Sequence, residues 1–316
     1  MRVLLCPASL KGVLSARAAA VALARGVEEA GGDGVVLPVA DGGEGTAEAL
    51  ETALGGGWHD ARVSDPLGRP VDASWLLLPD RRAVVEAAAA IGLPHLEPAE
   101  RDPLTASSRG FGELVLAALQ SSPVSLVLTL GGVATVDGGK GLRELVAELP
   151  VPTVVLCDVQ TRLGDAARLF GPQKGASADA VATLTRQLDA MEELRPYAEL
   201  SGAGAAGGLG AALAALGAEL VSGAPTVLDL LGFDEELARC DLVVTGEGQV
   251  DETTFEGKAP GEVASRCAAG GVRCVVFGGR VLSELEGAET VALSGDPDRA
   301  EQDLIELGRS LVGHAA

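Results

Sequence analysis

The chain has 316 residues, about two domains' worth, and its 47% hydrophobic content is enough to build buried cores. Lys and Arg total 24 against 45 for Asp and Glu, so the formal net charge is −21 at pH 7. Such a charge repels nucleic-acid phosphates and anionic lipids, which excludes nucleic acid as an expected partner. No apolar run approaches the roughly 20 residues of a membrane span, and the N-terminus lacks a signal-peptide cleavage site. We therefore expect a cytoplasmic protein without a membrane partner.

Cysteine and histidine offer little chemistry in this sequence. The five cysteines are odd in number and contain no C-x-x-C pair, which indicates neither a disulfide framework nor a zinc site. Only three histidines occur, so imidazole chemistry has few candidates. If the protein is an enzyme, carboxylates and lysines must carry its catalysis.

Five short apolar runs near the two ends of the chain are typical of strands that are buried on both faces. They are residues 3–6, 35–39, 242–245, 274–277 and 290–293. Helical patterns lie between them at 15–30, 258–269 and 298–312, with a shorter one at 282–286, and Ser15 and Asp298 are candidate N-caps. This alternation predicts an α/β fold with a flavodoxin-like, five-stranded parallel sheet, built from residues 1–58 and 237–316.

Residues 59–236 are then predicted to form an inserted mixed α/β domain. Hairpin-like strands are expected at 59–64, 71–78 and 83–87, further strands at 126–130 and 153–157, and helices at 109–120, 178–194 and 208–216. The alternative, two consecutive domains that divide near residue 150, leaves few parallel strands in the first half. The discontinuous arrangement is therefore preferred.

Glycine-rich loops with charged side chains follow the first three strands of the predicted parallel sheet. Residues 7–12 carry Lys11, residues 40–45 carry Asp41 and Glu44, and residues 246–251 carry Glu247 and Asp251. The carboxyl ends of parallel strands share one edge of a sheet, so these loops should converge there. Each acidic loop alone could be a plain turn before a helix. Their recurrence favours a site for an anion accompanied by a divalent cation, with Lys11 and Lys258 facing the same crevice.

The inserted domain adds three loops of its own. Residues 130–141 follow a strand and carry Asp137, and residues 170–176 form a tight turn that should expose Lys174. Residues 201–208 contain G-x-G-x-x-G, which keeps a dinucleotide-binding oxidoreductase open as an alternative. The segment before them is a poor strand and the expected acidic residue is absent, so this alternative is weakly supported.

Taken in order, the loops resemble one known family. They read P-x-S-x-K-G-x-L-S-A, P-V-A-D-G-G-E-G-T, L-G-G-x-A-T-x-D-G-G, C-D-V, F-G-P-Q-K-G-A, G-A-G-A-A-G-G-L-G and T-G-E-G-x-x-D-x-x-T-x-x-G-K-A-P. This order, which runs from Pro7 to Pro260, is similar to the bacterial glycerate kinases of glyoxylate and glucarate metabolism. The resemblance implies ATP-dependent phosphorylation of D-glycerate, usually at the 2-hydroxyl, with Mg²⁺. It also implies a flavodoxin-like domain interrupted by a second α/β domain, with the active site between them.

The resemblance assigns expected roles to residues of this chain. The expected catalytic residues are Asp41, Asp251, Lys11 and Lys258, and the two aspartates are also the expected metal ligands. The expected substrate-binding residues are Ser9, Glu44, Glu247 and Asp137. The expected cofactor-binding residues are Gly42, Gly43, Gly131, Gly132, Gly207 and Gly208. The expected partner is a small hydroxy acid, and the chain could form a homodimer. Which aspartate acts as base and which binds metal stays open.

The chain also departs from the family pattern. Polar family positions are occupied by Ala8, Val133, Val136, Gln249 and Thr253, and the chain is short between residues 141 and 151. Three readings stay open: a glycerate kinase with rearranged contacts, a kinase for another small hydroxy acid or alcohol, and a catalytically silent relative that binds a nucleotide or metabolite as a regulator.

Overall fold

The chain folds into two compact units, each formed from more than one segment. The computed structural model describes residues 1–255, 257–283 and 287–313. Unit 1 comprises Met1–Asp41, Glu48–Leu54 and Ala224–Ala316, and unit 2 comprises Gly42–Ala47 and Gly55–Gly223. The domain bounds expected from the sequence, 1–58 with 237–316 and 59–236, stay a prediction. No helix within the described ranges combines the length and apolar character of a membrane span.

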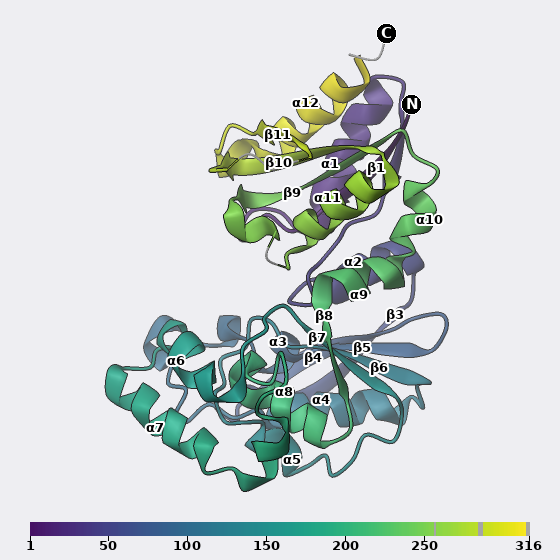
Figure 1. Ribbon diagram of the computed structural model, residues 1–316. Coiled ribbons are helices and arrows are strands. Elements are labelled where there is room, and N and C mark those ends of the chain that lie inside the picture. Colours follow the sequence, from purple (N-terminus) through teal and green to yellow (C-terminus); the bar gives the residue numbers. More distant parts are fainter. Residues whose placement is uncertain (256, 284–286, 314–316) are drawn as a thin grey trace. The chain divides into compact units, whose positions relative to one another are not determined.

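Unit 1 is built on a five-stranded parallel sheet, which confirms the predicted fold class (Figure 1). Its strands are β1 (Arg2–Pro7), β2 (Asp33–Val36), β9 (Leu242–Val250), β10 (Arg273–Val281) and β11 (Glu289–Ala292). The strand order is β11-β10-β9-β1-β2, and every neighbouring pair is parallel. This is the flavodoxin-like order, in which the direction of winding reverses between β1 and β9.

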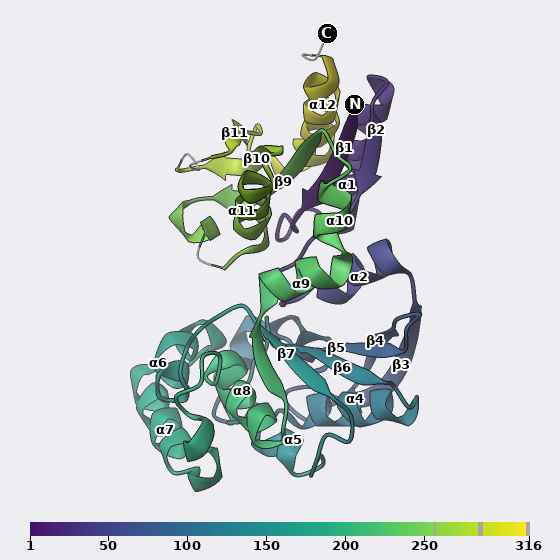
Figure 2. The ribbon, with the colours of Figure 1, turned by 45° about the vertical axis from the view of Figure 1, so that its right-hand side comes forward.

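Helices cover both faces of this sheet. Helices α1 (Ala16–Glu29) and α12 (Ala300–Gly313) lie side by side, and their apolar residues share a core with Val3, Leu5 and Phe277 (Figure 2). Helix α11 (Ala259–Gly270) packs on β9 and β10. The remaining helices assigned wholly or mainly to this unit are α2 (Thr46–Leu54), α9 (Gly223–Leu231) and α10 (Phe233–Leu237).

One predicted helix cap is confirmed and the other is wrong. The Ser15 hydroxyl accepts a hydrogen bond from the Ala18 amide at the start of α1. Asp298 does not cap α12, because a 3₁₀ turn precedes that helix and Asp296 accepts the bond there, from the Asp298 amide. The short helical pattern at 282–286 reaches residues 284–286, which lie outside the described residues.

Strands β9 and β10 are longer than their apolar runs predicted. Both continue past the expected ends at Thr245 and Phe277, and they stay paired as far as Val250 and Val281. Most of the segment 246–251 is therefore strand and not loop. Strand β2, by contrast, ends earlier than predicted, at Val36 instead of residue 39. The chain after it still follows β1, because the Leu37 and Val39 amides donate to the Leu5 and Pro7 carbonyls.

Unit 2 contains a mixed six-stranded sheet, as predicted for the insertion. Its strands are β3 (Gly57–Ser64), β4 (Pro70–Leu77), β5 (Arg82–Glu86), β6 (Ser125–Thr129), β7 (Thr153–Cys157) and β8 (Glu219–Ser222), in sequential order. The pairs β3–β4 and β4–β5 are antiparallel, and the remaining pairs are parallel. Strand β8 was not predicted, because it is short and only half-buried.

The helices of unit 2 lie on this sheet or pack on other helices beside it. They are α3 (Ala87–Ile91), α4 (Arg109–Gln120), α5 (Lys140–Arg143), α6 (Ala166–Phe170), α7 (Ala178–Asp189) and α8 (Ala205–Ala215). The helix predicted at 178–194 is too long, because α7 ends at Asp189 and a separate 3₁₀ helix, Glu192–Tyr197, follows. Phe111 of α4 and Leu128 of β6 belong to the main core of the unit.

Candidate functional site

The loops that leave β1 and β9 lie side by side in unit 1. Pro7 pairs with Gly246, and the Ala8 amide donates to the Gly246 carbonyl at 2.9 Å. A Cβ atom added to Gly248 would lie 4.0 Å from the Lys11 amide nitrogen. Because winding reverses between β1 and β9, this is the edge at which such sheets bind ligands. The predicted neighbourhood of the first and third loops is therefore found, with Lys11 exposed beside Gly248 and Ser9 half-buried.

Glu247, Thr254 and Lys258 form a cluster at the end of β9. The Lys258 Nζ lies 3.3 and 3.4 Å from the two Glu247 carboxylate oxygens, and the Thr254 hydroxyl donates to Glu247 Oε1 at 2.9 Å. Burial raises the pKa of Glu247, although the bonds from Thr254 and Lys258 oppose that shift. Lys258 directly precedes α11, so its backbone is fixed by the helix start. The cluster places one cation and one partly shielded carboxylate at the strand end.

Asp251 is held by two of the residues that depart from the family pattern. Thr253 donates to Asp251 Oδ1 through its hydroxyl, at 2.5 Å, and through its amide, at 2.9 Å. The Gln249 side-chain amide donates to Oδ2 at 2.8 Å. These bonds, led by the Thr253 hydroxyl, lower the pKa of Asp251 to about 2. Asp251 is therefore a carboxylate at neutral pH, and Gln249 and Thr253 orient it.

Asp41 is the last residue of the first segment of unit 1. It lies half-buried, two residues beyond Val39, whose amide donates to the Pro7 carbonyl at 3.0 Å. This register brings Asp41 toward the end of β1. The expected catalytic and metal-binding roles of Asp41 stay predictions.

In unit 2, the segment Gly42–Ala47 contacts the loop after β6. A Cβ atom on Gly131 would lie 2.7 Å from the Gly43 Cα, so the two backbones touch where no side chain fits. The Glu44 carboxylate is exposed and extends over the neighbouring Gly132, since a Cβ there would lie 3.5 Å from Glu44 Oε2. Two of the predicted glycine-rich loops are thereby brought together.

Glu86 is a site residue that the sequence reasoning missed. It ends β5, and its carboxylate accepts the Ala47 amide at 2.8 Å and the Gly45 amide at 3.4 Å. Burial raises the pKa of Glu86, and the nearby Glu44 carboxylate adds to the shift. The signal in the sequence was a lone carboxylate at the end of the apolar run 83–87.

Asp137 binds groups of the protein itself. Its Oδ2 accepts the Ser108 amide at 2.9 Å, the Ser108 hydroxyl at 2.7 Å and the Gly141 amide at 3.1 Å, while Oδ1 accepts the Gly139 amide at 3.1 Å. Four donors on two oxygens indicate a structural role at the start of α5. The expected substrate contact of Asp137 stays a prediction.

The glycines at the start of α8 serve loop packing. Gly207 has a φ of 67°, and a Cβ atom there would overlap the backbone of Thr135 and Val136. The neighbouring Gly208 lies against Gly138, and the Gly138 amide donates to the Gly207 carbonyl at 3.0 Å. The segment 206–208 thus closes on the loop after β6. A contact of Gly207 or Gly208 with a cofactor stays a prediction.

The expectation that Lys174 is exposed is wrong. Its side chain is only 3% exposed, and its Nζ donates to the Thr135 carbonyl at 2.7 Å. The turn that carries it, Pro172–Lys174, directs the side chain inward. Burial lowers the pKa of Lys174 to about 7, against the opposing charge of Asp137. In the described part of the chain, the buried Thr135 hydroxyl beside it has no hydrogen-bond partner.

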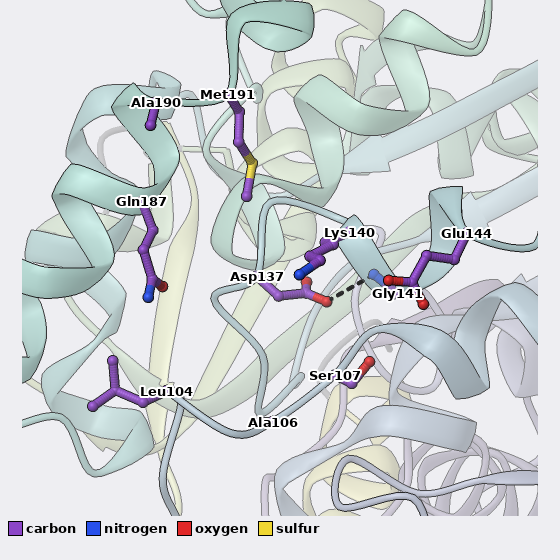
Figure 3. A pocket seen from close by; sticks show the side chains of 10 residues that line it. All are labelled: Leu104, Ala106, Ser107, Asp137, Lys140, Gly141, Glu144, Gln187, Ala190 and Met191. Carbon is purple, nitrogen blue, oxygen red and sulfur yellow. Dashed lines mark hydrogen bonds between the residues drawn. The ribbon is translucent and has the colours of Figure 1, made fainter.

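A pocket of about 510 Å³ lies in unit 2 next to Asp137 (Figure 3). Figure 3 shows Gln187 and Met191 on one side of it and Lys140 and Glu144 on the other. The complete lining is Leu104, Ala106, Ser107, Asp137, Lys140, Gly141, Glu144, Gln187, Ala190 and Met191. The pocket is lined by acidic, basic and apolar side chains.

Comparisons with known proteins agree with this architecture. The sequence profile of the glycerate kinase family matches residues 3–149 and 143–295. Glycerate 2-kinase of Escherichia coli K12 is 39% identical over 84% of this chain and 81% of its own. Glycerate kinase of Bacillus subtilis 168 is 36% identical over 89% and 85%.

A solved structure gives the same result at the level of the fold. A Salmonella typhimurium LT2 protein, provisionally assigned as glycerate kinase 2, superposes with a TM-score of 0.86 at 33% identity, over 99% of this chain and 98% of its own. The flavodoxin-like unit, the charged strand ends and these matches define the protein as a kinase. More specifically, the chain belongs to the glycerate kinase family.

The burial of Lys174 predicts a pH dependence of stability. Its pKa is about 7 in the folded protein and about 10.5 in the unfolded chain, so between these values the unfolded state binds more protons and stability rises with pH. Lys174→Met removes this contribution. From pH 7 to 9, the free energy of unfolding of the wild type should gain about 2 kcal/mol relative to the variant. Urea titrations of both proteins at both pH values measure the difference, and parallel pH curves would contradict it.

Proposed function

We propose that this protein phosphorylates D-glycerate with ATP and Mg²⁺, at the 2-hydroxyl. The observation that carries the proposal is the cluster at the end of β9. There Lys258 forms an ion pair with Glu247, and Asp251, four residues after Glu247, is ionised. The curated relatives in the same family are a glycerate 2-kinase and a glycerate kinase, which supports glycerate as the acceptor. The cytoplasmic location and the homodimer stay predictions.

Phosphoryl transfer needs positioned groups and charge neutralisation more than covalent chemistry by the protein. Lys11 and Lys258 are suited to bind the glycerate carboxylate or the transferred phosphoryl group. Asp251 remains a carboxylate at neutral pH, so it is able to accept a proton or to hold a cation.

The two candidate metal ligands, Asp41 and Asp251, suit an Mg²⁺ ion that arrives bound to a nucleotide. In the ranges that the structure describes, no group of three or more Asp, Glu, His or Cys side chains is arranged to hold a metal. Mg²⁺ in kinases is commonly bound by one or two carboxylates together with substrate phosphates. Asp41 and Asp251 would supply those carboxylates, and the ion would neutralise phosphate charge.

The departures from the family pattern do not by themselves indicate a silent protein. Gln249 and Thr253 both hold Asp251. Val133 and Val136 are buried, and each packs in one of the cores of unit 2. Nothing in the structure explains Ala8. A related small hydroxy acid is the second candidate substrate, since the same carboxylate and hydroxyl chemistry would serve it.

The dinucleotide alternative loses its support. In the G-x-G-x-x-G fingerprint, the glycines let a pyrophosphate approach the backbone. Here Gly207 abuts Thr135 and Val136 instead.

An ADP-release assay with D-glycerate, ATP and Mg²⁺ tests the proposed function. We expect ADP release that requires glycerate and is abolished by EDTA, and phosphorus NMR should show the phosphate on the 2-oxygen of the product. A small panel of other hydroxy acids should react more slowly. Absence of glycerate-dependent ADP release from folded protein would refute the proposal.

Asp251→Asn should lower turnover by at least about 100-fold, because the neutral amide can neither take a proton nor hold a cation as a carboxylate does. Asp296→Asn is the matched control: Asp296 is another accessible aspartate whose Oδ1 accepts the amide two residues on, at 3.0 Å, but it lies before α12. The control should keep turnover within about two-fold. Equal activity of the two variants in the same assay would exclude the proposed role of Asp251.

A further inference from the structure

The chain enters unit 2 for only six residues between two stretches of unit 1. The segment Gly42–Ala47 belongs to unit 2, whereas Met1–Asp41 and Glu48–Leu54 belong to unit 1. Three of the six residues are glycines, which contribute no side chain to packing. Glycine also loses more conformational freedom than other residues when it is ordered. A segment of this kind needs specific contacts to hold one conformation.

Close packing on two sides limits where the segment can lie. Gly131 abuts Gly43, and a Cβ atom on Gly42 would lie 2.7 Å from Leu156 Cβ. The segment also closes on itself, because the Thr46 hydroxyl donates to the Gly43 carbonyl at 2.7 Å. These steric contacts prevent the segment from coming closer to its neighbours, but they do not prevent it from moving away from them.

Glu86 forms hydrogen bonds that hold the segment. Its two carboxylate oxygens accept one amide each, from Ala47 and Gly45, at the beginning of α2. Amides at a helix start have no partner within the helix, and a carboxylate there is also favoured by the helix dipole. Glu86 is itself fixed by its place at the end of β5, in the interior of the sheet. The carboxylate therefore ties the segment to the sheet of unit 2.

We propose that Glu86 is a positioning residue for phosphoryl transfer, which acts by holding the segment Gly42–Ala47 in its active conformation. The proposal rests on the proposed function, because it assumes that this segment takes part in the reaction. Glu86 acts through the backbone of the segment, and it need not touch the substrate.

The test compares Glu86→Ala and Glu86→Gln with the wild type. In Glu86→Ala both amides lose their acceptor, whereas glutamine keeps one acceptor oxygen but presents an amide group to the second backbone N–H. We expect kcat for glycerate phosphorylation to fall about 10- to 100-fold in the alanine variant and less in the glutamine variant. KM should change less than kcat, and hydrogen exchange in a peptide that spans residues 43–50 should accelerate.

Glu113→Ala is the matched control, because Glu113 is also a half-buried carboxylate that accepts a backbone amide, that of Ser64, at 2.7 Å. It should change neither kcat nor exchange at 43–50 by more than about two-fold. If Glu86→Ala does not fold, Glu86→Gln decides. Unchanged kcat and exchange in a folded Glu86 variant would overturn the proposal. If the wild type shows no glycerate-dependent turnover, the proposed function fails, and the exchange data still decide whether Glu86 holds the segment.

Discussion

Close approach of backbone to backbone is the constraint on which the loops of unit 2 depend. Gly131 touches Gly43, and Gly207 touches the backbone at Thr135 and Val136, in places where a methyl group does not fit. A buried loop must satisfy its polar groups, and here carboxylates and an amine do so: Glu86 accepts two amides, and Lys174 donates to a carbonyl. The close contacts at glycine and the hydrogen bonds of Glu86 and Lys174 therefore act together to hold these loops.

In unit 1, charged side chains are brought together at the end of β9. A formal charge of −21 repels phosphate at long range, so the proposed binding of phosphate needs positive charge close to the site. Glu247 keeps Lys258 at the strand end, and Thr253 and Gln249 fix an ionised Asp251 close to it. The surroundings of Asp251 are therefore set by hydrogen bonds from Gln249 and Thr253.

The sequence predicted the fold better than the site. Alternation of apolar runs with helical patterns is a local signal, so the parallel sheet, α4 and β7 were predicted well. Strand β9 was cut short because its glycines resemble a loop, although ladder pairing with β10 continues to Val250. Glu86 was missed because the amides that it accepts are 39 and 41 residues away. Lys174 was placed on the surface because its carbonyl partner belongs to a distant loop, which composition cannot reveal.

Glu86 can hold the segment Gly42–Ala47 only if the segment packs closely against Gly131, and Gly131→Ala tests that requirement. Gly131 has an ordinary φ, so the added methyl acts through its overlap with the backbone of Gly43 and Glu44. Gly164→Ala is the control, since a Cβ there meets nothing within 4 Å. We expect glycerate-dependent turnover to fall at least about ten-fold in Gly131→Ala and to stay within about two-fold in Gly164→Ala. Equal turnover in the two folded variants would contradict it.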